Sequence, residues 1–235
     1  DHLRDFYQPD RVVVAAAGDL EHERVADLVA VAFGRWEGRA IAANGSSPTT
    51  HHTVRHEERD SAQLHLVLGA EGLPYNHTGR YAFYMLNAIL GSSMSSRLFQ
   101  EIREKRGLAY SIYSYQASYH DSGLLAVYAG TSAESYPQVV DLIRAEFARL
   151  RQGPVDLQEF HRAKAQLKGN LLLGLESTSS RMTRLAKTEI YFQRYFDLDE
   201  IIQGIDAVSP ETFAELNRSL FEPWHYALTT IGRLN

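Results

Sequence analysis

The chain contains the same spacing of an aromatic residue, a proline and a glycine twice, and this internal repeat limits its possible folds more than any other feature. Near the start, an aromatic residue and Pro9 lead through an apolar run to Gly18, and near the end an aromatic residue and Pro223 lead through a second apolar run to Gly232. In both places the proline and the glycine are nine residues apart. Repeated spacing is the sequence mark of repeated supersecondary units. It predicts the tail of one α/β repeat and the whole of a second, so that the first repeat would lack its front.

The pattern of apolar residues predicts helices packed on a mostly antiparallel sheet. Short apolar or alternating runs are typical of strands, and apolar residues at helical spacing are typical of helices. The expected strands cover residues 12–17, 63–69, 108–119, 124–129 and 226–231. The expected helices cover residues 21–33, 78–90, 97–105, 134–151, 157–173, 179–195 and 210–220. The fold class predicted is α+β, an α/β two-layer arrangement in which helices pack on the sheet.

Composition excludes several classes of protein. Of the 235 residues, 44% are hydrophobic and 23% are charged, which is typical of a globular chain rather than a disordered or fibrous one. The formal net charge is −5 and no basic run occurs, so nucleic acid is not an expected partner. No apolar stretch approaches the ~20 residues of a membrane helix, so no membrane is expected either. The absence of cysteine excludes disulfides, thiolate metal sites and cysteine nucleophiles.

Two histidines, His52 and His56, have the i, i+4 spacing with which a helix can hold zinc. Their segment contains β-branched residues and no helical periodicity, and in an extended chain such residues lie ~13 Å apart. Arg55 also puts a positive charge where a hydrolytic metal site would need a carboxylate. We interpret these histidines as solvated linker residues, and the sequence offers no metal ligands.

Arg103 and Tyr110 are the strongest candidates for chemistry. Arg103 is expected near the end of a helix and Tyr110 near the start of the next strand, so a turn at Gly107 can bring both side chains to one cleft. A guanidinium and a phenol together suit a peptide carbonyl, which gains negative charge when it is attacked. The same spacing also allows Arg103 to pair with Glu104 and Tyr110 to be an ordinary strand residue.

Two neighbouring features receive structural interpretations. Residues 91–96 form a small-residue loop that lacks the pattern of a nucleophile elbow or a phosphate loop, which favours a flexible connector. The face of the strand opposite Tyr110 carries Tyr113, Tyr115 and Tyr119. We expect these three rings to pack under helices.

Residues 91–110, with the sequence GSSMSSRLFQEIREKRGLAY, resemble the pitrilysin/insulinase family of zinc metallopeptidases. The resemblance is closest to the branch that contains mitochondrial processing peptidase and its bacterial relatives. Further matching stretches occur in the family's order along nearly the whole chain, at residues 6–10, 18–19, 175–182 and 206–211.

The resemblance implies two similar α/β repeat domains, in agreement with the repeated spacing. It places residues 1–38 at the tail of the first, catalytic domain, residues 39–58 in a linker, and residues 59–235 in the second, substrate-clamping domain. The family's zinc site is an inverted H-x-x-E-H helix with a later glutamate, upstream of the stretch that contains Phe6. This chain is therefore expected to hold no metal ligand and to be inactive alone, with zinc in the full-length protein or a partner.

The resemblance also implies a function for the chain. It would be the C-terminal, non-zinc-binding half of a zinc-dependent endopeptidase that hydrolyses peptides in a closed chamber. Arg103 would hold a substrate carbonyl, and Tyr110 would donate a hydrogen bond to the tetrahedral intermediate. The expected partners are a peptide substrate and the missing N-terminal catalytic half, and the resemblance also implies a homodimer. The compartment stays open between bacterial cytoplasm and periplasm.

Two other functions stay open. A non-catalytic accessory subunit would use Arg103 and Tyr110 to complete the site of a zinc-bearing partner subunit. A scaffold subunit, as in the respiratory-complex core proteins that resemble this family, would need neither residue. The presence of both residues argues against the scaffold and does not separate the first two functions.

Overall fold

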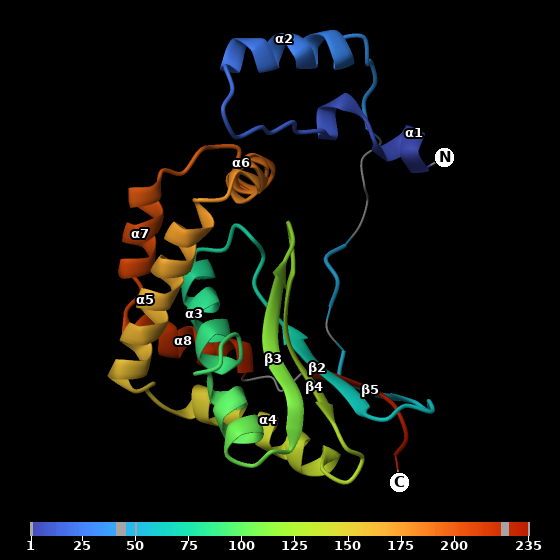
Figure 1. Ribbon diagram of the computed structural model, residues 1–235, viewed down its shortest axis with the longest axis vertical. Helices are drawn as coiled ribbons and strands as arrows, with labels where there is room; N and C mark the ends of the chain where they lie inside the picture. The colour runs from blue at the N-terminus through green and yellow to red at the C-terminus, as the bar shows by residue number, and fades with distance from the viewer. Residues whose placement is uncertain (1, 41–45, 50, 222–225, 235) are drawn as a thin grey trace. The chain divides into compact units, whose positions relative to one another are not determined.

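The computed structural model describes residues 2–40, 46–49, 51–221 and 226–234 (Figure 1). The chain divides into two compact units. Unit 1 comprises Asp1–Ser46 and Gly169–Leu198, and unit 2 comprises Ser47–Lys168 and Asp199–Asn235. The two units are therefore interleaved along the sequence.

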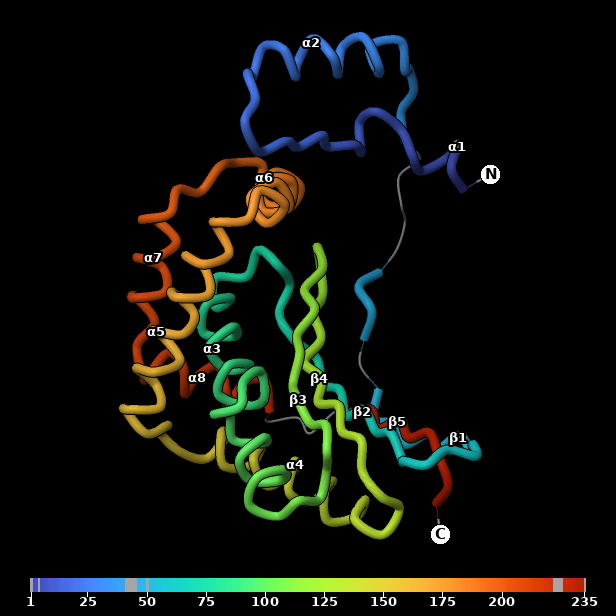
Figure 2. Tube along the Cα trace, viewed as in Figure 1, coloured from blue at the N-terminus to red at the C-terminus, as the bar shows by residue number. Residues whose placement is uncertain are grey.

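Unit 2 is built on a five-stranded sheet with the strand order β1-β5-β2-β4-β3. The strands are β1 (Thr53–Glu57), β2 (Leu64–Glu71), β3 (Ala109–Ser118), β4 (Gly123–Thr131) and β5 (Tyr226–Ile231). β1 pairs with β5 in parallel, and all other neighbours are antiparallel. The predicted hairpin is formed by β3 and β4, and its path can be followed in Figure 2. The prediction of a mostly antiparallel sheet is confirmed.

Helices cover one face of this sheet. The helical elements that lie wholly or mainly in unit 2 are α3 (Arg80–Leu90), η2 (Phe99–Glu104), α4 (Tyr136–Gln152), α5 (Leu157–Gly174), α7 (Leu198–Asp206) and α8 (Pro210–Phe221). In Figure 1, α3 and α4 lie on the same side of β3 and β4, and α3 contacts β3 while α4 contacts β4. The predicted α+β class, with a sheet packed by helices, is therefore confirmed.

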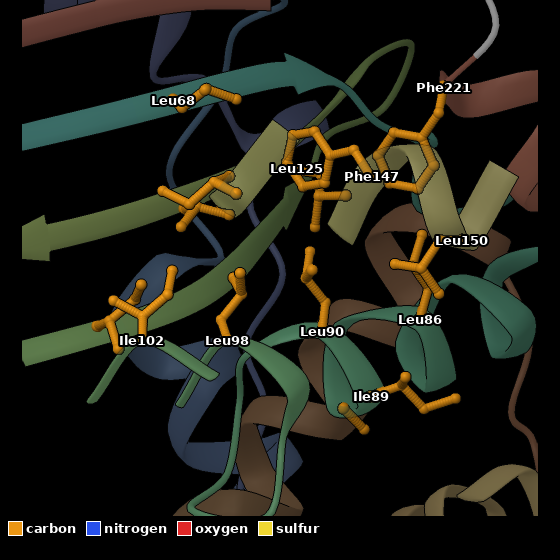
Figure 3. Packing of buried hydrophobic residues seen from close by; sticks show 14 of the residues in the cluster. Leu68, Leu86, Ile89, Leu90, Leu98, Ile102, Leu125, Phe147, Leu150 and Phe221 are labelled. Carbon is orange, nitrogen blue, oxygen red and sulfur yellow. The ribbon is translucent and has the colours of Figure 1, made fainter. Parts of the chain in front are cut away.

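The core of unit 2 lies between the sheet and these helices. Figure 3 shows Leu68 and Leu125 from the sheet on one side of the core and Leu86 and Leu90 from α3 on the other, and each of these side chains is at most 1% exposed. The rings of Phe147 in α4 and Phe221 in α8 stack with centroids 4.8 Å apart. Burying one such side chain stabilises the fold by about 1.5–3 kcal/mol, so this layer fixes the elements that carry the candidate site.

Unit 1 contains helices without a comparable core. Its elements are α1 (His2–Phe6), η1 (Pro9–Arg11), α2 (His22–Phe33) and α6 (Thr178–Phe192). No described residue of α2 is buried, and Val31 is 85% exposed. Across all described ranges, no helix combines the length and the apolar character that crossing a bilayer requires.

The strand predicted for residues 12–17 is not formed. Within the described ranges, the N–H groups of residues 13–17 donate no backbone hydrogen bond, and Val14 is 52% exposed. A β-strand needs a neighbour that completes its ladder of hydrogen bonds, and none of the described strands pairs with this segment. The prediction was therefore wrong for the chain by itself.

Two further elements differ from the prediction. β1 lies inside the range that was expected to be a linker. Its backbone pairs with β5, although none of its five residues is buried. Helix α7 was not predicted, although its apolar residues face one side and Ile205 is buried. β1 is short and has no buried face, so it gives a weak signal in the sequence. The apolar residues of α7 recur at helical spacing, so its sequence does carry the signal of a helix.

Candidate functional site

Arg103 lies in η2, whose backbone is a π-helix. The N–H of Lys105 donates a hydrogen bond to the carbonyl of Gln100, five residues earlier, with an N···O distance of 3.0 Å. Leu98 and Ile102 are fully buried and hold this turn on the core. The Arg103 side chain is left 37% exposed. Turns of this kind are rare and occur frequently at functional sites.

Gly107 ends the π-helical turn. Its φ of 63° is in the left-handed region, which glycine adopts without the steric cost of a side chain. Its N–H donates to the carbonyl of Arg103, and the next N–H, that of Leu108, donates to the carbonyl of Ile102; both N···O distances are 3.0 Å. The chain thus reverses sharply from η2 into β3, as the sequence predicts.

A β-bulge at the start of β3 presents Tyr110. Ala109 pairs with Thr131 and Ser111 pairs with Gly130, so Tyr110 is the extra residue between two consecutive pairs. Its side chain is 75% exposed. Bulges redirect side chains and are frequent next to active sites.

The structure brings Arg103 and Tyr110 together and adds an aromatic neighbour. The guanidinium carbon of Arg103 lies 5.1 Å from the ring centroid of Tyr110 and 4.7 Å from that of Phe99. Both distances are within the range of a cation–π interaction. The alternative partner of Arg103, Glu104, lies beyond hydrogen-bond distance, because its carboxylate is 3.8 Å from Nε of Arg103.

The other cations of this segment are held by Glu101. Lys105 donates a hydrogen bond to the Glu101 carboxylate at 3.0 Å, and Arg106 donates to the same carboxylate and, at 2.9 Å, to the Glu101 carbonyl. The hydrogen bonds from Lys105 and then Arg106 lower the pKa of Glu101, so its carboxylate stays charged and keeps both cations. Arg103 is thereby left facing the aromatic rings.

Hydrogen bonds attach the loop at residues 91–96 to β3 and η2. The N–H of Ser114 donates to the carbonyl of Gly91 at 3.1 Å, and the side-chain amide of Gln100 donates to the carbonyl of Met94 at 2.8 Å. Ser96 is 2% exposed and donates its hydroxyl to the carbonyl of Ser93. The loop is therefore joined by hydrogen bonds to the element that follows it, η2, and the side chain of Met94 is exposed.

The tyrosines of β3, and Tyr119 directly after it, do not pack under helices. Tyr113, Tyr115 and Tyr119 are 46%, 37% and 56% exposed, respectively. Because the bulge adds one residue, the buried positions of β3 continue at Ile112 and Ser114, and the tyrosines face the other side of the sheet. The expectation failed because the bulge changes the alternation, and the sequence does not reveal a bulge here.

His52, directly before β1, and His56 in β1 do not fit a zinc site. The two ring nitrogens of His56 lie 2.8 Å from the hydroxyl of Thr230 and 3.2 Å from the carboxylate of Glu58. His52 packs its ring against Tyr226, with centroids 5.3 Å apart. Among the residues that the structure describes, no group of three or more His, Asp or Glu residues could hold a metal ion.

Phe99 is not among the site residues that the sequence predicts. It lies four residues before Arg103 in a helical segment, and residues at this spacing share a helix face. This spacing was the signal that could have identified it.

Comparison with known proteins adds the following similarities. A family model described as "Peptidase M16 inactive domain" matches residues 1–167. The chain is 41% identical over 231 residues to the uncharacterized zinc protease YmxG of Bacillus subtilis, covering 98% of this chain and 56% of that protein. An uncharacterized zinc protease of Streptomyces coelicolor is 36% identical over 232 residues, covering 94% of this chain and 50% of that protein. The chain thus spans about half the length of these relatives.

A solved structure shows the same fold. The peptidase M16 inactive domain from Pseudomonas fluorescens is similar with a TM-score of 0.81 at 22% sequence identity. The similarity covers 92% of this chain and 52% of that one. At this identity the likeness extends to the fold alone.

Proposed function

Because the chain belongs to the M16 peptidase family, as an inactive, C-terminal domain, we propose that it is the substrate-clamping half of a zinc-dependent endopeptidase. The zinc ion would be held by another part of the full-length protein or by a partner subunit, since the described histidines do not fit a zinc site. The peptide would be hydrolysed in a chamber that this half helps to close.

The observation that carries this proposal is the placement of Arg103. Its guanidinium lies within cation–π distance of the rings of Phe99 and Tyr110, and the neighbouring cations Lys105 and Arg106 are paired with Glu101. A guanidinium held by ring faces keeps its N–H donors free for an acceptor in its own plane. The carbonyl oxygens of an extended peptide are such acceptors.

Tyr110 would act on the oxygen that becomes negatively charged. A bulged position and an exposed side chain direct its hydroxyl to the solvent side, where a bound peptide would lie. A donor aimed at the developing oxyanion stabilises the transition state more than the ground state. In this proposal Arg103 orients the substrate and Tyr110 supports the tetrahedral intermediate.

We also propose the domain division suggested by the repeated spacing, with residues 1–38 as the tail of a first domain, residues 39–58 as a linker and residues 59–235 as the second domain. Two glycines support it. Gly18 and Gly232, which end the two apolar runs, have φ angles of 146° and 138°. A positive φ at both positions is expected if the two segments are copies of one structural unit.

The test uses the full-length protein and a peptide substrate, with Tyr110→Phe as the variant. Removing the phenolic hydroxyl should lower kcat by about 10–1,000-fold, as expected for the loss of one oxyanion donor. Tyr119→Phe is the matched control, because it removes the same group from an exposed position near the other end of the β3–β4 hairpin. An unchanged kcat in Tyr110→Phe would remove this residue from the mechanism.

Arg103→Ala tests the substrate-holding role separately. It should raise KM and lower kcat/KM if Arg103 binds the peptide, and it should leave both unchanged if the chain is only a scaffold. If the full-length protein is active only after a zinc-bearing partner is added, the accessory-subunit function replaces the self-sufficient one, with the same roles for both residues.

A further inference from the structure

A buried ionic cluster lies directly before the π-helical turn. Arg97 donates two hydrogen bonds to the Glu159 carboxylate, from Nε at 2.9 Å and from Nη2 at 2.6 Å. Its Nη1 also lies 3.8 Å from the carboxylate of Glu146. The Glu146 side chain is 4% exposed and is paired on its other side with Arg149. Two cations thus balance two carboxylates, and three of the four side chains are largely removed from water.

The neighbouring carboxylates favour the charged form of Arg97. Burial would lower the pKa of Arg97, but its hydrogen bonds to Glu159 and the charges of Glu159 and Glu146 together raise the pKa above its ordinary value. The two-pronged geometry matters as much as the charge, because a planar guanidinium facing a carboxylate allows little rotation.

The cluster ties three elements together at one point. Glu146 lies in α4, Glu159 lies in α5, and Arg97 lies in the first turn of residues 96–105, where the N–H of Gln100 donates to the carbonyl of Ser96 at 3.0 Å. Phe99 follows Arg97 by two residues and stacks on Arg103. A rotation of the turn at Arg97 would therefore move the ring that supports Arg103.

A buried ion pair is weak evidence for a role in stability. Well-packed apolar side chains often stabilise a fold as much as such a pair does. A pair is better suited to fixing one orientation among several, because its hydrogen bonds are directional. The burial of Leu98 and Ile102 already attaches residues 96–105 to the core, so the ion pair is available to set the orientation of the turn.

We propose that Arg97 is a positioning residue for Arg103, and this inference rests on the proposed function. Its pairing with Glu159 and Glu146 sets the rotation of the π-helical turn and so keeps Phe99 and Arg103 in the arrangement that binds substrate. Arg97 itself touches neither substrate nor the reacting atoms.

The first experiment measures amide hydrogen exchange in the full-length protein, with Arg97→Lys and Glu159→Gln as mild variants that should still fold. Residues 99–107 should exchange about tenfold faster in both variants, because the two-pronged pair is lost. The strands β2 and β4 should exchange as in the unmodified protein.

Lys168→Gln is the matched control. It removes another ion pair of α5, the one between Lys168 and Asp206 at 2.8 Å, and it should leave the exchange of residues 99–107 unchanged. Unchanged exchange at residues 99–107, or equal acceleration of every element, would overturn the inference.

The second experiment asks whether Arg97 acts through Arg103. Arg97→Lys should lower kcat/KM by about 10–100-fold, as for a small misplacement of a binding group. The same change should cause no further loss when Arg103 is already alanine, because the positioned group is then absent. An equal fold loss in both backgrounds would mean a general structural role and would contradict the inference. If Arg103→Ala alone leaves kcat/KM unchanged, the proposed function fails, and hydrogen exchange still decides whether Arg97 orients the turn.

Discussion

Two apolar segments of this chain can be compared residue by residue. A shift of 214 positions brings Pro9 onto Pro223 and Gly18 onto Gly232, and it also brings residues 12–17 onto strand β5. β5 lies between β1 and β2 and is hydrogen-bonded on both edges. Residues 13–17 donate no backbone hydrogen bond within the described ranges.

The difference teaches that this type of segment depends on its neighbours to become a strand. The glycines after the two segments have nearly the same φ, so the local backbone preference is kept in both places. The ladder, in contrast, requires two other strands, because backbone groups inside a sheet must be paired on both edges. We propose that residues 12–17 pair in the same way when the rest of a first domain is present.

The largest expected effect is on amide hydrogen exchange of the chain by itself. Residues 226–231 should exchange at least about 10³-fold more slowly than residues 13–17, because core ladders open only with global unfolding. Mass spectrometry of peptic fragments measures both segments in one experiment. In the full-length protein, residues 13–17 should become protected as well, and continued rapid exchange there would contradict the proposed first domain.

The second prediction concerns a pair of matched side chains, Leu228 and Val14. Leu228 is 3% exposed and belongs to the core of unit 2, whereas its counterpart Val14 is 52% exposed. Leu228→Ala should lower the free energy of unfolding by about 2–5 kcal/mol through a lost core contact and a cavity. Val14→Ala should change it by no more than about 0.5 kcal/mol.

Urea denaturation followed by circular dichroism checks this pair. A loss for Val14→Ala that approaches that of Leu228→Ala would mean that residues 12–17 already pack into a core in the isolated chain. In the full-length protein the two losses should become more similar.

The smallest expected effect is the difference in stability between alanine variants at the two glycines, Gly18 and Gly232. Alanine at either position is strained by the positive φ, and at Gly232 its Cβ would also lie 3.0 Å from the carbonyl oxygen of Gln63. Gly232→Ala should therefore lower the free energy of unfolding by about 2–3 kcal/mol, and Gly18→Ala should lower it by about 1 kcal/mol. Thermal denaturation of both variants measures the difference, and equal costs would show that backbone strain alone decides at both sites.

Much of the fold of unit 2 was predictable because its elements have strong periodic signals. The final strand was predicted with its observed bounds, and the hairpin and α4 were predicted within two residues at each end. β1 was not predictable, since it has no buried face and depends on pairing with a strand far along the chain. Helix α7 was not predicted, although its apolar residues recur at helical spacing and could have indicated it. The strand at residues 12–17 was predicted from its apolar, β-branched composition. Such a segment becomes a strand only when neighbouring strands are present to pair with its backbone.

The candidate site was predictable in part. The spacing of Arg103 and Tyr110 around Gly107 indicated their proximity, and the structure brings the two side chains together. Their chemical roles stay a prediction. The ion pair of Arg97 with Glu159 joins residues 62 positions apart, and one sequence carries no signal for such a contact.

The position of β5 between β1 and β2 also has a consequence for the order of folding. Leu228 pairs with Leu68, and Ala227 pairs with Thr53, so the contacts of β5 close very long loops. Contacts of this kind form late, because the entropy of loop closure must be overcome first. During synthesis, β2 would present an open edge, and β1 would have no partner strand, until residue 231 has left the ribosome. A chaperone that shields an open sheet edge would therefore help most in the interval between the synthesis of β2 and that of β5.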